Sequence, residues 1–432
     1  MKKSGKRVLC LVMIAALLAG LSGCTTFNNF KNAFFSDPGA ATERTIKIGV
    51  YESITGANKA QGKEEVMGIE LAYELYPTVL GKNVELIYAD NKSDMYEAET
   101  AIQTLLTNDI SVVLGSYGET ITLVASDYIK MASVPAITIS STNPLITANN
   151  PYYFSATYTE ARQGDALANF AYDTALKDSV ATVKMANDDT ATATIKRFTN
   201  RIKKVTGNNK SVAGNFTISA DTTDFTETIE KLRSSGAKAV FLAISPAAAE
   251  KFLQQCMDNQ YTHVLFLGTR AWNDEKFIKF ASENSKIDIA FCAEEPAAIE
   301  TELSKIFMRA YVSKYGEESK PSGRTAAAFD AYILALKGIE DAYSTLQNED
   351  VEKYTAKAGS DGEAKAIREA WNEALEKGIP TGSQIKNAIT AIKDFQGASG
   401  TINYNGSNEA TKTITINYID GAEDASVYVA AK

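Results

Sequence analysis

From Thr45 onward, short apolar segments alternate with amphipathic segments, and this alternation constrains the fold more than any other feature of the chain. Apolar runs of about 4–8 residues are typical of buried strands, while apolar residues three and four positions apart mark one face of a helix. The first series of expected strands comprises residues 46–50, 84–89, 112–115 and 134–139, with helices around 66–75 and 97–107. Strands joined by helices pair in parallel, because a parallel connection needs a crossover.

The same alternation then repeats. Expected strands lie at 180–185, 211–218, 239–244 and 264–268, with helices near 192–205, 225–234 and 247–259 between them. A chain of 432 residues exceeds the ~250–300 residues that one core supports. The sequence therefore predicts an α/β fold with two doubly wound parallel-sheet lobes. Helices around 306–312, 324–342 and 385–392 continue the fold, and strands at 401–404 and 413–418 close it.

The N-terminus has the pattern of an export signal. Basic residues in 1–7 precede the apolar run 8–19, which is shorter than the ~20 residues that a membrane span needs. The run ends in Leu-Ser-Gly before Cys24, as in bacterial lipoprotein signals, in which the cysteine thiol receives a diacylglyceryl group. We therefore expect a signal peptide over 1–23, a lipid on Cys24 that anchors the protein to the membrane outside the cytoplasm, and a tether over 24–44.

Composition and motifs exclude several classes of function. The net charge of −9 and the lack of a basic stripe argue against nucleic-acid binding. The sequence contains neither a G-x-S-x-G elbow nor a Walker loop, so we expect no enzyme and no cofactor. The acidic doublets Asp188-Asp189 and Glu294-Glu295 are interpreted as solvated faces.

Three residues bear on metal binding and redox state. His263 is the only histidine, and without paired cysteines beside it we expect no zinc site. Cys256 and Cys292 remain in the expected folded part. Outside the cytoplasm they form either a disulfide or two buried thiols, and the sequence leaves both alternatives open.

A series of short motifs runs through residues 46–418. They are IKIGV (46–50), TG (55–56), GIELA (68–72), ADNKSD (89–94), VLGSY (113–117), VPAI (134–137), SSTNP (140–144), QGDALA (163–168), TDF (223–225), SGAKAVF (235–241), YG (315–316) and DFQGASG (394–400). Their order resembles that of type I periplasmic binding proteins, and within them the branched-chain amino-acid (leucine/isoleucine/valine) binding group. Residues 342–380, rich in Glu, Lys, Ala and Gly, match nothing in that pattern and are expected to form a helical insertion.

The resemblance implies a monomeric receptor whose lobes close on a small ligand, with a hinge that the chain crosses three times. The implied partners are an ABC permease and its ATPase. The division that it implies is a first lobe from 45–158 and 291–398, a second lobe from 159–290, and C-terminal strands over 399–432 that return towards the second lobe. Ligands in such sheets sit beyond the carboxyl ends of the strands.

The resemblance places the ligand against two loops of the first lobe. One contains Tyr117, Gly118 and Glu119, and the other contains Ser140, Ser141 and Thr142. In the family these loops hold a ligand carboxylate with hydroxyls and backbone amides. Helix capping is the alternative role of the hydroxyls. Gln61 falls where the family often has an aromatic wall.

Two charges depart from the amino-acid binders. Glu119 stands where they usually have a serine that meets the ligand carboxylate, and Arg270 stands where they have an acid that grips the α-ammonium. Three explanations are open: Glu119 and Arg270 form a closing salt bridge, each meets an opposite charge on the ligand, or Arg270 is a solvated rim charge. Under the second explanation, the ligand is an amino acid bound in reversed orientation or a small anion gripped by Arg270.

The remaining candidates come from the second lobe. Asp189 follows its first strand and either recognises a cationic group or caps the next helix. Ser245 lies in the corresponding loop two strands later. Trp272 is either an apolar wall over the ligand or an anchor in the core. The altered charges and the insertion also leave open a non-transport lipoprotein that acts as a sensor or activates a cell-envelope enzyme.

Overall fold

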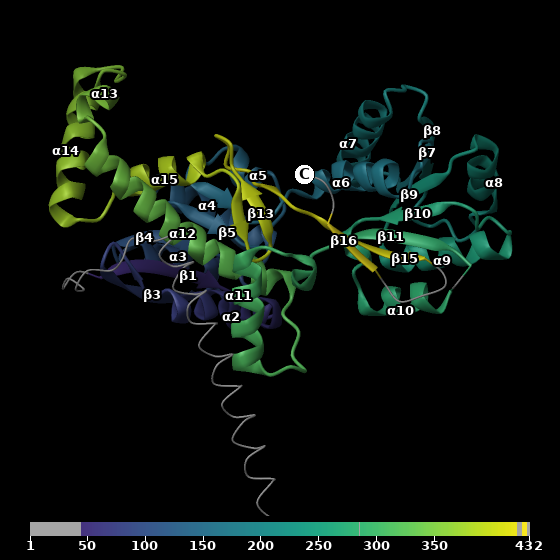
Figure 1. The fold of residues 1–432 in the computed structure, drawn as a ribbon, viewed down its shortest axis with the longest axis horizontal. Helices are drawn as coiled ribbons and strands as arrows, with labels where there is room; N and C mark the ends of the chain where they lie inside the picture. Colours follow the sequence, from purple (N-terminus) through teal and green to yellow (C-terminus); the bar gives the residue numbers. More distant parts are fainter. Residues whose placement is uncertain (1–44, 285, 421–425, 430–432) are drawn as a thin grey trace, which may run out of the picture.

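The computed structural model describes residues 45–284, 286–420 and 426–429, which form two lobes lying side by side (Figure 1). The predicted signal peptide, the lipidation site Cys24 and the tether lie outside these residues. Two mainly parallel sheets with helices on both faces confirm the predicted fold class. In the described part of the chain, no helix is both long enough and apolar enough to cross a membrane.

The first lobe is built on a six-stranded sheet in the order β2-β3-β1-β4-β5-β6. Its parallel strands are β1 (Ile46–Glu52), β3 (Lys82–Asp90), β4 (Ile110–Leu114), β5 (Ala136–Thr138) and β6 (Tyr153–Ser155), and β2 (Thr78–Val79) pairs antiparallel at one edge. The helices around it are α2 (Lys59–Leu75), α3 (Met95–Leu106), α4 (Glu119–Ala132), α5 (Leu145–Ala148), α11 (Glu302–Tyr315) and α12 (Gly323–Asn348). Successive side chains of β1 alternate between the faces: Val50 packs with α2 and α12, and Tyr51 packs with α3 and α4.

The second lobe repeats this plan on a seven-stranded sheet in the order β16-β15-β11-β10-β9-β7-β8. Its strands are β7 (Val180–Met185), β8 (Val212–Ile218), β9 (Ala239–Ala243), β10 (Leu265–Gly268), β11 (Asp288–Ala293), β15 (Thr415–Asp420) and β16 (Ser426–Val429), the last two antiparallel. Helices α8 (Thr226–Ser235), α9 (Pro246–Asp258) and α10 (Glu275–Glu283) cover one face, and α6 (Gln163–Asn169) and α7 (Asp189–Thr206) cover the other. Cys256 and Cys292 are free, buried thiols in this lobe.

The C-terminal strands divide between the lobes, which corrects the expectation that 399–432 as a whole returns to the second lobe. Strands β12 (Phe395–Gly397), β13 (Gly400–Asn403) and β14 (Thr411–Lys412) form a small antiparallel sheet on the first lobe. They remain there because Ile402 and Tyr404 are buried in the first lobe's core, where the Tyr404 hydroxyl donates to the Ser155 carbonyl at 3.0 Å. Only β15 and β16 join the second sheet.

The chain passes between the lobes three times, after β6, after β11 and after β14. Asp330 of α12 fixes the turn that leads to the third crossing. Its carboxylate accepts hydrogen bonds from the backbone N–H groups of Ala398 at 2.6 Å and Ser399 at 2.8 Å. Gly397 leaves room for this carboxylate, since an added Cβ would lie 2.4 Å from its Oδ2 atom. The motif DFQGASG therefore builds a hinge-side turn.

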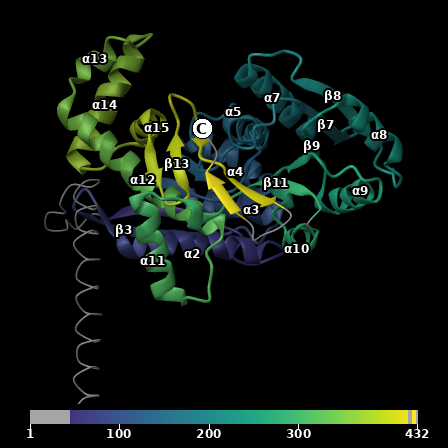
Figure 2. The same cartoon turned by 45° about the vertical axis from the view of Figure 1, so that its right-hand side comes forward.

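The segment 342–380, expected as a helical insertion, continues α12 and contains α13 (Val351–Thr355) and α14 (Asp361–Lys377). Leu346, Trp371 and Ala374 form its own small buried cluster. In Figure 1 these helices lie at the far end of the first lobe, away from the second lobe. Figure 2 shows the two lobes from a second direction, with α13 and α14 at one end of the molecule and α8 at the other. The chain returns through α15 (Gly382–Ala391), which packs on α12.

Helices α2 and α12 approach so closely that position 68 has no space for a side chain. A Cβ added to Gly68 would lie 2.1 Å from the carbonyl oxygen of Thr325. We expect Gly68→Ala to lower the free energy of unfolding by about 2 kcal/mol, because overpacking outweighs the about 1 kcal/mol that alanine gains in a helix. Urea unfolding checks this. The matched control is Gly362→Ala, where the added Cβ meets only Ser360 Oγ at 3.9 Å, and this variant should be more stable than the wild type. Equal changes in the free energy of unfolding for the two variants would contradict the packing argument.

Candidate ligand-binding cleft

A cavity of about 880 Å³ lies between the lobes, at the carboxyl ends of their strands. Its walls come from the loops after β4, β5 and β10, from the first turns of α7 and α12, and from the hinge. The lining residues are Tyr117, Glu119, Ser140, Thr142, Asn143, Pro144, Leu145, Thr159, Glu160, Ala161, Asp189, Thr190, Ala193, Arg197, Arg270, Ala271, Asn273, Glu294, Arg324 and Glu409. Their polar character suits a hydrophilic solute.

On the first-lobe wall, Tyr117 and Glu119 follow β4 while Ser140 and Thr142 follow β5. The Thr142 hydroxyl donates to Glu119 Oε1 at 3.1 Å, so the two predicted loops are bonded to each other. The Arg324 guanidinium lies over the Tyr117 ring, 5.7 Å from its centroid. This wall thus combines one acid, two hydroxyls and an aromatic ring.

Two buried carboxyls, Glu52 and Glu65, support this wall from below. The Tyr117 N–H donates to Glu52 Oε2 at 3.1 Å, and the Ser140 hydroxyl donates to Glu65 Oε1. Both side chains are 0% exposed. Burial raises the pKa of Glu65 to about 7, and burial together with the charge of Glu65 raises the pKa of Glu52 well above its usual range. One proton shared between the two carboxyls would satisfy Glu52 Oε1 and Glu65 Oε2, which have no other partner in the described residues.

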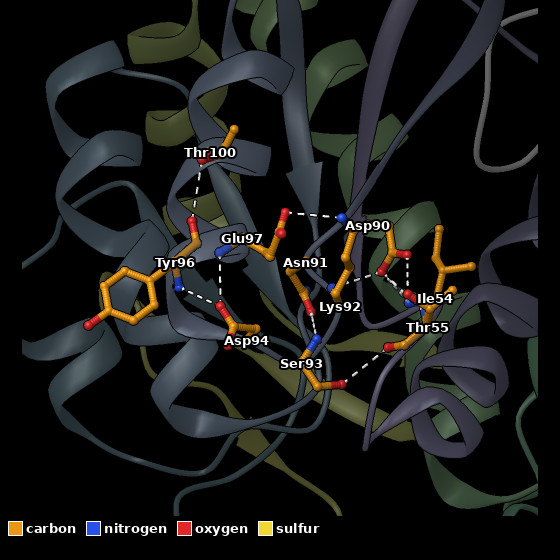
Figure 3. A network of polar contacts seen from close by, with 10 residues as sticks. All are labelled: Ile54, Thr55, Asp90, Asn91, Lys92, Ser93, Asp94, Tyr96, Glu97 and Thr100. Atoms are coloured by element: carbon orange, nitrogen blue, oxygen red, sulfur yellow. Dashed lines mark hydrogen bonds and ion pairs between the residues drawn. The ribbon is translucent and has the colours of Figure 1, made fainter.

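The loops after β1 and β3 are tied together beside this wall (Figure 3). Asp90 Oδ1 accepts the N–H groups of Ile54 and Thr55 at 3.1 and 3.2 Å. Burial alone would raise the pKa of Asp90, but the hydrogen bond from the Thr55 hydroxyl, together with those from the N–H groups of Lys92, Thr55 and Ile54, lowers it. The neighbouring Asn91 donates to Ser116 Oγ at 2.8 Å and so connects the network to the cleft loop.

On the second-lobe wall, the first turn of α7 presents Asp189 to the cavity. The helix is capped by Asp188, whose carboxylate accepts the Ala191 N–H at 2.8 Å. The capping role considered for Asp189 is therefore wrong, and its own carboxylate remains available to the cleft. The acidic charge lies at the positive end of the helix dipole, where it is favoured.

Arg270 pairs with two acids that the sequence did not connect to it. Its guanidinium lies 3.4 Å from Glu160 and 3.7 Å from Glu294. The closing Glu119–Arg270 salt bridge, one of the open alternatives, is absent from the ion pairs of the described residues. The Arg270 side chain is only 28% exposed, so the alternative of a solvated rim charge is wrong. Burial alone would lower the pKa of Arg270, but Glu294 and the other nearby acids raise it above its usual value.

Glu294 is the point at which the three hinge crossings meet. It follows β11, accepts the Thr157 hydroxyl of the first crossing at 3.1 Å, and is close to Lys412 of the third. Burial alone would raise the pKa of Glu294, but the charges of Lys412 and Arg270 outweigh burial and lower it. Its interpretation as part of a solvated acidic face was wrong.

The family model described as periplasmic binding protein matches residues 45–420. The chain belongs to the periplasmic binding protein family. A search of the curated proteins finds no match.

Solved structures share the fold of this periplasmic binding protein across most of its length. A leucine binding protein from Thermotoga maritima is 24% identical, with 89% of this chain and 98% of that chain covered and a TM-score of 0.59. A putative branched-chain amino-acid ABC transporter protein from Rhodospirillum rubrum is 19% identical, with coverage of 89% and 100% and a TM-score of 0.70. A solute binding protein from R. palustris in complex with benzoate is 13% identical, with coverage of 90% and 96% and a TM-score of 0.56.

Of the predicted ligand residues, the structure brings Tyr117, Glu119, Ser140, Thr142, Asp189 and Arg270 to one cavity. Gln61, on α2, is not among its lining residues. Gly118 directly precedes α4 and has a φ of 97°, and Ser141 is buried with its hydroxyl 2.9 Å from that of Thr122. The Ser141 side chain therefore supports its loop from behind and does not line the cavity.

Ser245 and Trp272 also lie away from the cavity lining. Ser245 caps α9, and its hydroxyl accepts the Ala248 N–H at 3.4 Å. Trp272 is 0% exposed and packs against Phe277, with tilted rings whose centroids are 4.6 Å apart. Its indole N–H donates to the Ile244 carbonyl at 2.9 Å. Of the two roles that the sequence left open for Trp272, the structure therefore supports the anchor in the core and not the wall over the ligand.

Proposed function

We propose that this protein captures a small polar solute between its two lobes and delivers it to an ABC permease. The observation that carries the proposal is the polar cavity of about 880 Å³ between two lobes that are joined by three chain crossings. Closure about such a hinge would remove the solute from water and change the surface that a permease contacts. Two solved structures of the same fold are a leucine binding protein and a solute binding protein in complex with benzoate, and the sequence of this chain predicts an amino acid or small anion.

The N-terminal segment supports an extracytoplasmic site of action. The proposed lipid on Cys24 would hold the receptor at the membrane surface, with the tether over 24–44 leaving the two lobes free to meet a permease. No catalytic group is part of this proposal. Across the described residues, no cluster of three or more His, Cys, Asp or Glu side chains is placed to hold a metal ion.

A thermal-shift screen against a panel of small metabolites tests the proposal. At least one compound should raise the melting temperature, because a ligand present at 100 times its Kd stabilises the folded state by about 2.7 kcal/mol. Ala193 lines the cavity from α7, so Ala193→Trp should abolish the shift by filling the cleft. The matched control Ala366→Trp, on an exposed position of α14, should keep it. A well-folded protein that responds to no compound would refute solute capture.

A further inference from the structure

The charges that line the cavity are largely neutralised within the protein itself. Arg270 pairs with Glu160 and Glu294, Arg197 pairs with Asp165 at 2.7 Å, and Arg324 pairs with Glu64 at 2.8 Å. Glu409 is held by Arg162 at 3.0 Å. Each of the three guanidinium groups that line the cavity therefore already has a carboxylate partner, and an anionic ligand would have to compete with it.

Two carboxylates of the cavity remain without a cationic partner. Glu119 on the first lobe receives a hydrogen bond only from Thr142 among the described residues. Asp189 on the second lobe takes part in none of the ion pairs of the described part of the chain. The charge of Glu119 contributes to the raised pKa of Arg270, but the ion pairs of Arg270 are made with Glu160 and Glu294.

These two acids face the cleft from opposite lobes, and both are exposed to water in this structure. Closure would strip water from them and bring two like charges together, which is unfavourable unless a positive charge lies between them. We propose that the solute is an organic cation whose ammonium group lies between Glu119 and Asp189. This inference rests on the proposed function and replaces the predicted amino acid or small anion with a ligand of net positive charge.

The cavity also provides a surface for the hydrocarbon part of such a ligand. Leu145 is 60% exposed and lines the cavity beside Pro144, at the start of α5. A large apolar side chain exposed in a polar cleft gains stability when an alkyl group covers it. An aliphatic amine satisfies both features, because it carries a positive charge at one end and an alkyl chain at the other.

Probes that share the branched alkyl chain of leucine and differ in their charged groups test the assignment. Leucine is a zwitterion, 3-methylbutylamine is the same skeleton without the carboxylate, and 4-methylpentanoate is the same skeleton without the amino group. A parallel series of linear C2–C6 diamines and dicarboxylates covers other ligand lengths. In calorimetric titrations of the full two-lobed protein, the amines should bind at least about tenfold more tightly than their matched carboxylates, and their affinity should fall with added salt.

Two variants test whether the ammonium group of the ligand lies between Glu119 and Asp189. Glu119→Gln and Asp189→Asn should each weaken binding of the best amine by about 10- to 100-fold, because each removes one charge-assisted hydrogen bond. Glu376→Gln, on an exposed position of α14, is the matched control and should leave the affinity unchanged.

Each other result overturns the proposal. If the carboxylates bind as tightly as the amines or more tightly, the charge assignment is wrong while solute capture stands. If amines bind but neither cleft variant weakens them, the ammonium does not lie between these acids. If neither series binds but the metabolite screen finds an uncharged or anionic ligand, the cation proposal fails alone. If the screen also finds none, solute capture fails with it.

Discussion

Asp330→Ala is expected to lower the free energy of unfolding at pH 7 by about 4 kcal/mol. The substitution removes the acceptor of two backbone N–H groups, those of Ala398 and Ser399, in a place where Asp330 itself is 0% exposed. A buried donor left without a partner costs about 1–3 kcal/mol. Burial raises the pKa of Asp330 to about 6, so removing the carboxyl also relieves some desolvation, but two unpaired amides and the vacated volume outweigh that relief.

Urea unfolding followed by circular dichroism measures this loss. Asp341→Ala is the matched control, because Asp341 lies on the same helix and is 43% exposed in an i,i+4 pair with Lys337. Such a pair contributes about 0.3–0.5 kcal/mol. Hydrogen exchange at Ala398 and Ser399 should accelerate in the Asp330 variant alone. Similar unfolding free energies for the two variants would show that the turn does not depend on Asp330.

Glu65→Gln is expected to stabilise the protein by about 3 kcal/mol above pH 7 and to leave it nearly unchanged at pH 4.5. Burial raises the pKa of Glu65 from 4.5 to about 7 in the folded state. Between these pH values the unfolded chain ionises the carboxyl while the folded chain keeps it protonated. The wild-type protein therefore loses stability as the pH rises from 4.5 through 7, by about 1.4 kcal/mol for each pH unit.

Glutamine has the same shape, keeps an oxygen that accepts from Ser140, and does not titrate, so its stability curve should be flatter over this range. Melting temperatures measured from pH 4.5 to 8 give the comparison. Glu85→Gln, on an exposed position of β3, should follow the wild-type curve. A Glu65→Gln curve parallel to the wild-type curve would mean that Glu65 is already ionised at low pH.

The layered fold follows from local patterns in the sequence. The expected strand at 180–185 coincides with β7, and those at 239–244 and 264–268 differ from β9 and β10 by one residue at an end. Strands β6 and β11 were not expected: β6 has only three residues, and β11 mixes Asp, Ala and Cys with its apolar residues. The predicted return of β13 to the second lobe was wrong. Its position depends on the burial of Tyr404 against the first lobe, where Tyr404 contacts Ser155, a residue 249 positions earlier in the chain.

The sequence allowed us to predict which loops line the cleft, but not how the charged side chains in it pair. Loops after parallel strands must gather at one edge of a sheet, so Tyr117, Ser140 and Arg270 reach a common cavity. The partners of Arg270 come from two separate hinge crossings, and no local pattern relates Glu160 to Glu294. Trp272 was ambiguous since a loop aromatic packs equally well on a ligand or on its own core.

The two tryptophans of the chain occupy separate environments, Trp272 in the buried core of the second lobe and Trp371 in the small cluster of the insertion. Intrinsic fluorescence therefore divides into two signals that belong to different parts of the molecule. With Trp371 replaced by phenylalanine, the remaining emission would come from an indole directly behind the loop of Arg270. Such a single-tryptophan protein would let optical spectroscopy follow the second lobe alone, without an attached dye.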